Sequence, residues 1–255
     1  SKFDSAIEEL RQASQLPYSR FPLEYDIELP PAMLLPHMSA LRKCCVCLQL
    51  RAIAELQNGQ SHKALEDVQL ALRLADSVRT EPSLISHLVR IAILKLTLQP
   101  IWEGLAVHKW SDAQLSKLDQ ELARLDFLAD YKTAMHGELV LFQIGTFDCL
   151  RRHPKQIADV FGLASGEGFS PDDLPLIICG LIPSGGLYQN QLRCARPMVE
   201  LYLPLSDLNR RIISPTATRH ADEVIEAETK HLNPYNIVEK AMLPALGQAA
   251  KKFAS

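Results

Sequence analysis

Two amphipathic stretches joined by a glycine-containing turn, within residues 34–78, constrain the fold of this chain most strongly. In the first stretch the apolar residues recur at steps of three and four, on one face of a helix: Met38, Leu41, Cys45, Leu48, Ala52 and Leu56. The same spacing relates Leu65, Val68, Leu72 and Ala75 in the second stretch. Between them, Gly59 can adopt the left-handed conformation that ends a helix, and Ser61 can cap the next one. The sequence therefore predicts a helical hairpin.

This hairpin resembles one unit of the tetratricopeptide repeat (TPR) family, in which small residues let two helices pack closely. The matching small residues are Ala52, Gly59, Ala64 and Ala71. Arg51 and Glu55 depart from the family pattern, which prefers apolar or aromatic residues there. The unit is about 34 residues long, and the segment that follows does not repeat it. The resemblance implies one TPR-like hairpin inside a helical domain.

Composition favours helix in the rest of the chain as well. Of the 255 residues, 47% are hydrophobic, 22% are charged and only 11 are glycine, which is compatible with a large globular core. The alternation of polar and apolar residues that marks strands is scarce, whereas good helix formers are common. We expect an all-α protein of antiparallel helical hairpins, arranged as a TPR-like α-α superhelix or as an irregular helical bundle.

Breaks in the helical pattern divide the predicted fold into three parts. Residues 1–33 contain a short helix followed by a proline-rich arm, because the prolines forbid a continuous helix. Residues 34–150 form the helical-hairpin region, which includes a helix interrupted at Pro100 and a helix that begins with a capping box at Ser111 and Gln114. The pattern weakens at residues 151–168, and residues 165–255 form a C-terminal helical region that packs on the first. In this last region, residues with helical spacing are Tyr188, Leu192, Ala195, Val199 and Tyr202.

Charge and hydropathy exclude two classes of partner. The formal net charge of -3 does not provide the basic surface that nucleic-acid binding usually needs. The longest apolar runs, residues 91–94 and 174–182, are shorter than the roughly 18 residues of a membrane-spanning helix. We therefore expect no nucleic acid as a partner and no membrane segment within this sequence. A protein or peptide partner is the expectation that remains.

Motifs for cofactor, metal and catalytic chemistry are absent or incomplete. No phosphate-binding loop, nucleophile elbow or HExxH motif occurs, so we predict no cofactor and no catalytic residue. Glu228 and His231 form one ExxH pair, but a di-iron bundle needs two such pairs and two further glutamates. His37 precedes the cysteine cluster at residues 44–47, but no second cysteine pair with ligand spacing follows. We predict no metal site.

The cysteines are expected to be structural thiols. Cys44, Cys45 and Cys47 lie within one helical turn, where adjacent and i+3 positions do not readily reach disulfide geometry. Cys45 belongs to the apolar stripe, so its thiol should be buried and unreactive. Cys179 and Cys194 flank the glycine turn at residues 185–186 and are the pair most able to approach in an oxidising compartment.

Four residues form the best candidate binding site. His87 and Arg90 are the polar exceptions in an apolar helix, and Trp102 and Glu103 follow soon after the break at Pro100. A buried arginine needs a carboxylate partner, and Glu103 is the nearest candidate in the sequence. The four residues are therefore predicted to form either a satisfied core ion pair or a small-molecule pocket.

Several phrases of the chain resemble a group of bacterial helical proteins of undetermined activity. They are residues 35–37, 83–92, 101–105, 125–131, 182–191 and 234–236. Members of this group have an N-terminal membrane anchor and a further C-terminal segment. The resemblance implies an extracytoplasmic location, periplasmic or in the cell envelope, and it supplies no catalytic residues.

These observations predict a protein-interaction or scaffold module of a cell-envelope assembly that is not itself an enzyme. Stacked helical hairpins present surfaces suited to peptides or partner proteins. The competing hypothesis is a small-molecule receptor or hydrolase-type enzyme with a pocket near Arg90, Trp102 and Glu103. Convergence of the polar side chains on an open pocket would favour the receptor, and internal pairing would disfavour it.

Overall fold

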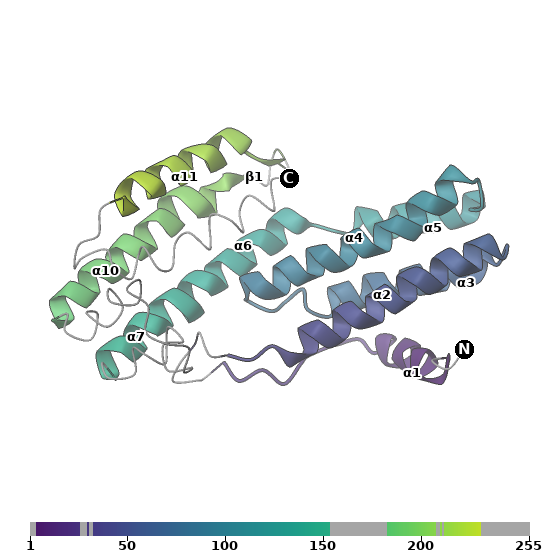
Figure 1. Ribbon diagram of the computed structural model, residues 1–255, viewed down its shortest axis with the longest axis horizontal. Coiled ribbons are helices and arrows are strands. Elements are labelled where there is room, and N and C mark those ends of the chain that lie inside the picture. The colour runs from purple at the N-terminus through teal and green to yellow at the C-terminus, as the bar shows by residue number, and fades with distance from the viewer. Residues whose placement is uncertain are drawn as a thin grey trace, which may run out of the picture. The chain divides into compact units, whose positions relative to one another are not determined.

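The computed structural model describes residues 4–25, 30, 33–153, 183–207, 210 and 212–230, and this part of the chain is all-α (Figure 1). Its α-helices are α1 (Asp4–Ser14), α2 (Pro36–Gln57), α3 (Ser61–Asp76), α4 (Leu84–Ala106), α5 (Asp112–Ala123), α6 (Phe127–Gly137), α7 (Gly145–Arg152), α10 (Ser184–Pro197) and α11 (Pro215–Thr229). Two π-helical segments, η2 (Glu138–Ile144) and η5 (Met198–Tyr202), and a 3-10 turn, η6 (Leu203–Leu205), extend them. The strands β1 (Ser206–Asp207) and β2 (Ile212–Ile213) form one short antiparallel ladder.

The chain forms two compact units that interleave along the sequence. Unit 1 consists of Ser1–Leu23, Leu35–Glu81 and Ile85–Asp130, and unit 2 consists of Glu24–Leu34, Pro82–Leu84 and Tyr131–Ser255. The division falls inside α6, between Asp130 and Tyr131. The predicted boundary at residues 151–168 lies mostly outside the described residues, as do Cys179, His231 and the end of the chain.

The predicted hairpin is present in unit 1 as α2 and α3, and its apolar stripe is confirmed. The buried residues of α2 are the six that the spacing identified, and all four predicted residues of α3 are buried as well. Gly59 has a φ of 75°. Its amide donates a hydrogen bond to the carbonyl of Leu56, and the amide of Gln60 donates to the carbonyl of Glu55. These two bonds form a Schellman motif, which explains why glycine ends α2.

The N-cap of α3 differs from the prediction. Gln60 occupies the cap position without a side-chain bond, and Ser61 is the first helical residue. The Ser61 hydroxyl instead accepts a hydrogen bond of 3.1 Å from the side-chain amide of Gln114, close to the start of α5. Ser61 therefore connects the hairpin to α5 rather than capping its own helix.

Helix α4 runs through Pro100 without a break, so the predicted interruption is wrong. Ile93 and Leu94 before the proline and Ile101 after it belong to the same buried cluster. Packing on both sides therefore outweighs the lost backbone hydrogen bond. The predicted capping box is confirmed, because the Ser111 hydroxyl and the Gln114 side chain bond reciprocally to backbone amides at the start of α5. Helix α5 then packs against α3.

Among the helices of the described residues, α4 is the one that is long and apolar enough to cross a membrane. The sequence prediction did not identify it, because it considered only uninterrupted apolar runs. About half of its most apolar window is buried inside the protein. The core helix of a globular protein passes the same test. The buried Arg90 near its N-terminal end also fits a core helix better, because a charge in lipid is costly.

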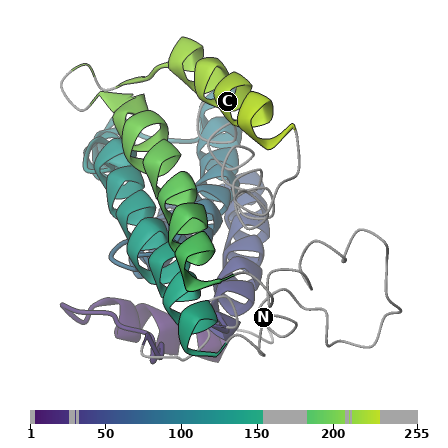
Figure 2. The same ribbon diagram turned by 90° about the vertical axis from the view of Figure 1, so that its left-hand side faces the viewer.

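In unit 2, the part of α6 from Tyr131 onward, η2 and α7 follow one another as an uninterrupted helical run, and α10 packs against α7 and η2 (Figure 2). The Tyr131 hydroxyl donates to the backbone carbonyl of Tyr202 at 3.1 Å. The helix expected from the spacing of residues 188–202 is present as α10 and η5. Of the five spaced residues, Tyr202 is buried, whereas Tyr188, Leu192 and Val199 are exposed. The buried residues of α10 are Leu187, Asn190, Cys194 and Pro197.

Candidate functional site

Arg90 lies at the centre of a charged network inside unit 1. Its side chain is 1% exposed. Nη2 donates to Oδ1 of Asp76 at 2.8 Å, and Nη1 donates to Oδ2 of Asp130. Arg79 donates from Nε to the other oxygen of Asp130 at 2.9 Å, and the Phe127 ring lies 5.2 Å from the Arg90 guanidinium. The charge of Arg90 is therefore compensated by two carboxylates, and the predicted ion pair exists with different partners.

Glu103 is not the partner of Arg90, which corrects the sequence prediction. Its carboxylate accepts a 2.8 Å hydrogen bond from the side-chain amide of Gln99 on the same helix. The physical reason is the continuity of α4. Because the helix does not break at Pro100, the 13 positions between Arg90 and Glu103 separate them by about 20 Å along its axis.

His87 is buried beside this network. Burial, with a smaller contribution from the positive charge of Arg90, lowers the pKa of His87 to about 4. The imidazole is therefore neutral at physiological pH. A protonated ring would place a second positive charge next to Arg90. His87 and Arg90 do lie near each other as the spacing predicted, but inside the core.

A second polar group, which the sequence did not predict, joins the arm to the start of α4. His37 Nε2 lies 2.9 Å from Oε1 of Glu81, the Ser86 hydroxyl donates to Oε2 at 2.6 Å, and the Phe21 ring stacks on His37 with centroids 4.2 Å apart. Serine, glutamate and histidine are residue types of hydrolases, but here the carboxylate lies between the other two. The serine hydroxyl bonds to Glu81 and not to a histidine base, so this geometry does not activate a nucleophile.

Asp67 anchors α1 on the hairpin. Its carboxylate is completely buried and lies 2.6 Å from Arg11 of α1 and 2.8 Å from Arg51 of α2. Burial raises the pKa of Asp67, and the two guanidinium groups act in the opposite direction. Asp67 lies 56 positions from Arg11, so spacing alone offered no signal for this pairing.

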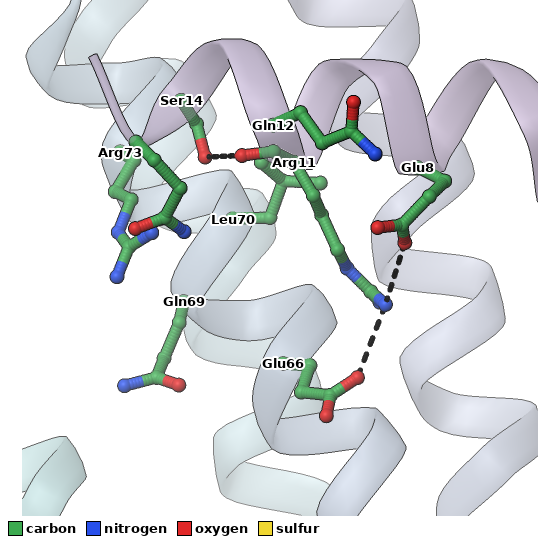
Figure 3. A pocket seen from close by; sticks show the side chains of 9 residues that line it. Glu8, Arg11, Gln12, Ser14, Glu66, Gln69, Leu70 and Arg73 are labelled. Carbon is green, nitrogen blue, oxygen red and sulfur yellow. Dashed lines mark hydrogen bonds and ion pairs between the residues drawn. The ribbon is translucent and has the colours of Figure 1, made fainter.

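Three cavities of unit 1 surround α1. One of about 410 Å³ is lined mainly by polar side chains of α1 and α3 (Figure 3), and its Arg11 pairs with Glu66 at 3.1 Å. One of about 580 Å³ lies between α1 and the α2–α3 hairpin. The third, of about 460 Å³, lies between the end of α1, the arm, α2 and the C-terminal end of α3. None of the four predicted site residues lines these three cavities.

Trp102 is on the surface, 69% exposed, with Leu98 and Leu105 beside it at 45% and 43%. We call these three side chains the α4 stripe, because steps of four and three place them on one face of α4. The backbone of α4 near these side chains packs against a buried tryptophan. Trp110 is buried against Gly104 and donates from its indole nitrogen to the carbonyl of Ile101 at 3.0 Å.

The three cysteines of α2 are free thiols, and the predicted burial of Cys45 is confirmed. Cys45 is buried, and burial raises the pKa of its thiol to about 12, whereas Cys44 and Cys47 are exposed. Within the described residues no group of three or more His, Cys, Asp or Glu side chains could hold a metal ion. His37, the histidine nearest these cysteines in the sequence, is engaged with Glu81 instead.

No family model, curated protein or solved structure matches this chain. Of the four predicted site residues, His87 and Arg90 are buried core groups, Glu103 pairs locally, and Trp102 is a solvent-exposed aromatic residue.

Proposed function

We propose that this protein is a non-enzymatic interaction module that binds a protein partner through the α4 stripe. The observation that carries the proposal is the exposure of Trp102 between two exposed leucines on one face of α4. Tryptophan is one of the residue types enriched among the side chains that dominate binding energy at protein interfaces. Adjacent apolar side chains exposed on one face also mark interaction sites more often than isolated ones do.

The stripe fits an amphipathic helix of the partner. Leu98, Trp102 and Leu105 follow the helical spacing with which two apolar helix faces pack together. Exposed polar residues flank the stripe, among them Lys95 and Gln99, and would form the rim that surrounds an apolar interface core. A partner helix with two or three apolar anchors at steps of three and four would complete this interface.

Two finer parts of the proposal have separate support. A TPR-like arrangement of α2 and α3 is supported by the burial of Ala52, Ala64 and Ala71, the small residues that this repeat places between its helices. An extracytoplasmic role in a cell-envelope assembly is supported only by the resemblance of several sequence phrases to anchored bacterial proteins.

The receptor or hydrolase hypothesis at Arg90, Trp102 and Glu103 loses its main support. Arg90 is compensated internally by Asp76 and Asp130, which is the outcome that disfavours a receptor at this place. Trp102 and Glu103 lie on a different part of α4, so the three side chains do not converge.

Site-specific photo-cross-linking tests the interaction. A photoreactive amino acid replaces Trp102 in one sample and Ile85 in the other, both in the full chain in its native source. Ile85 is the matched control, because it is also an exposed apolar residue of α4 but lies about 25 Å from Trp102 along the axis. We expect one adduct from position 102 and none from position 85.

The partner identified in this way is then purified and its affinity for the protein is measured. Trp102→Ala should weaken binding by at least about tenfold, the usual effect of removing a central aromatic anchor, and Ile85→Ala should not change it. Equal adducts from both positions, no adduct from a folded protein, or lipid as the cross-linked species would overturn the proposal.

A further inference from the structure

The third cavity of unit 1 has a largely apolar lining. Its volume of about 460 Å³ falls within the range of small-molecule sites. Leu10 of α1, Leu16 and Phe21 of the arm, Leu41 of α2 and Leu74 of α3 contribute apolar side chains to its lining. Leu16 is 67% exposed, whereas Leu41 and Leu74 are buried at the base. An aliphatic ligand would cover side chains that now face solvent.

Only two charged residues line this cavity, Arg73 and Asp76. The Asp76 carboxylate is compensated by Arg90, whose Nη2 lies 2.8 Å away. Arg73 is an exposed residue in the last turn of α3. It differs from Asp76, because no carboxylate of the described residues pairs with it. In Figure 3 Arg73 lies at the end of the neighbouring polar cavity away from the Glu8, Arg11 and Glu66 network. The cavity lining therefore has one uncompensated positive charge.

We propose that this cavity binds an aliphatic carboxylate of medium chain length. The tail would pack among the leucines and Phe21, and the carboxylate would accept hydrogen bonds from the Arg73 guanidinium. Arginine suits this role, because its planar donors match both oxygens of a carboxylate. The site involves no residue of the α4 stripe, so it is independent of the proposed protein interaction.

The test compares three ligands that share a ten-carbon tail: decanoate, decanol and decylamine. Each is titrated below its aggregation concentration into the full-length protein by isothermal calorimetry at neutral pH. We expect one site that prefers decanoate over decanol by about tenfold, the contribution of a charge-assisted hydrogen bond, and that binds decylamine most weakly.

Three variants locate the site, and a fourth serves as the control. Arg73→Gln should bind decanoate about as weakly as decanol, since it removes the charge, whereas Arg73→Lys should retain part of the preference. Leu16→Asn should weaken all three ligands, because this exposed side chain belongs to the apolar wall and the change introduces no charge. Arg124→Gln, which removes an exposed arginine outside the cavity, is the control and should bind as the unmodified protein does.

Each variant changes an exposed side chain, so its fold can be verified by circular dichroism before titration. No saturable decanoate binding, equal affinity for decanoate and decanol in the unmodified protein, or an unchanged preference in Arg73→Gln would each refute the site. Parallel losses in Arg73→Gln and Arg124→Gln would show a general charge effect and would refute it as well.

Discussion

Replacement of Asp130 by alanine tests the charged network around Arg90 most directly. The Asp130 carboxylate accepts hydrogen bonds from both Arg90 and Arg79. In Asp130→Ala the Arg90 side chain keeps only Asp76, which is itself half exposed to solvent. Alanine is a good helix former, so any loss of stability comes from the missing carboxylate and not from the helix propensity of α6.

The expected loss follows from burial. Arg90 is 1% exposed and Asp130 is 6% exposed, so the pair is removed from water. Removal of one partner from a buried pair costs about 3–5 kcal/mol, because the other charge is left buried. For a chain of this size this corresponds to a lower midpoint of thermal unfolding by roughly 6–20 °C. Asp76→Ala should cost only about 1 kcal/mol, since that partner is half exposed and the buried one remains.

Urea unfolding followed by circular dichroism measures both variants, and equal slopes of unfolding free energy against urea make the values comparable. A double variant, Arg90→Met with Asp130→Leu, should recover most of the lost stability, because apolar residues of similar size can replace a buried ion pair. A cost of Asp130→Ala that is no greater than that of Asp76→Ala would refute the assignment of Asp130 as the essential partner of Arg90.

Three further predictions concern other buried groups. The pKa of His87 is about 4 in the folded protein against an ordinary value of 6.5, so the unfolded chain takes up a proton first as pH falls. The contribution of His87 to the free energy of unfolding should therefore be complete above pH 6.5 and decrease by about 3 kcal/mol toward pH 4. The free energy of unfolding of His87→Gln, measured over the same pH range, should lack this decrease. Gly137→Ala should destabilise the protein by about 1–3 kcal/mol, because its new methyl group would overlap the Pro82 carbonyl, whereas Gly185→Ala meets open space and should be nearly neutral in the same assay. Cys45 should resist a thiol reagent in the native protein, whereas the exposed thiols of Cys44 and Cys47 should react within minutes. Equal reaction rates for all three would contradict the burial that raises the pKa of Cys45.

The sequence alone predicted the features that depend on neighbouring residues. Helical periodicity identified the buried face of α2 and α3, Gly59 identified the end of α2, and the Ser111 capping box identified the start of α5. Each of these is decided within one or two helical turns, where spacing and backbone conformation are sufficient. The burial of Cys45 follows from the same stripe.

Tertiary structure decided which distant groups meet. Arg90 bonds Asp130 across 40 positions, and His37 meets Glu81 across 44, so local spacing could not name these partners. Packing on both sides of Pro100 kept α4 continuous, which separated Arg90 from Glu103 and left Trp102 on the surface. Periodicity shows that a face is apolar, but only the three-dimensional arrangement of the other helices determines whether that face is covered.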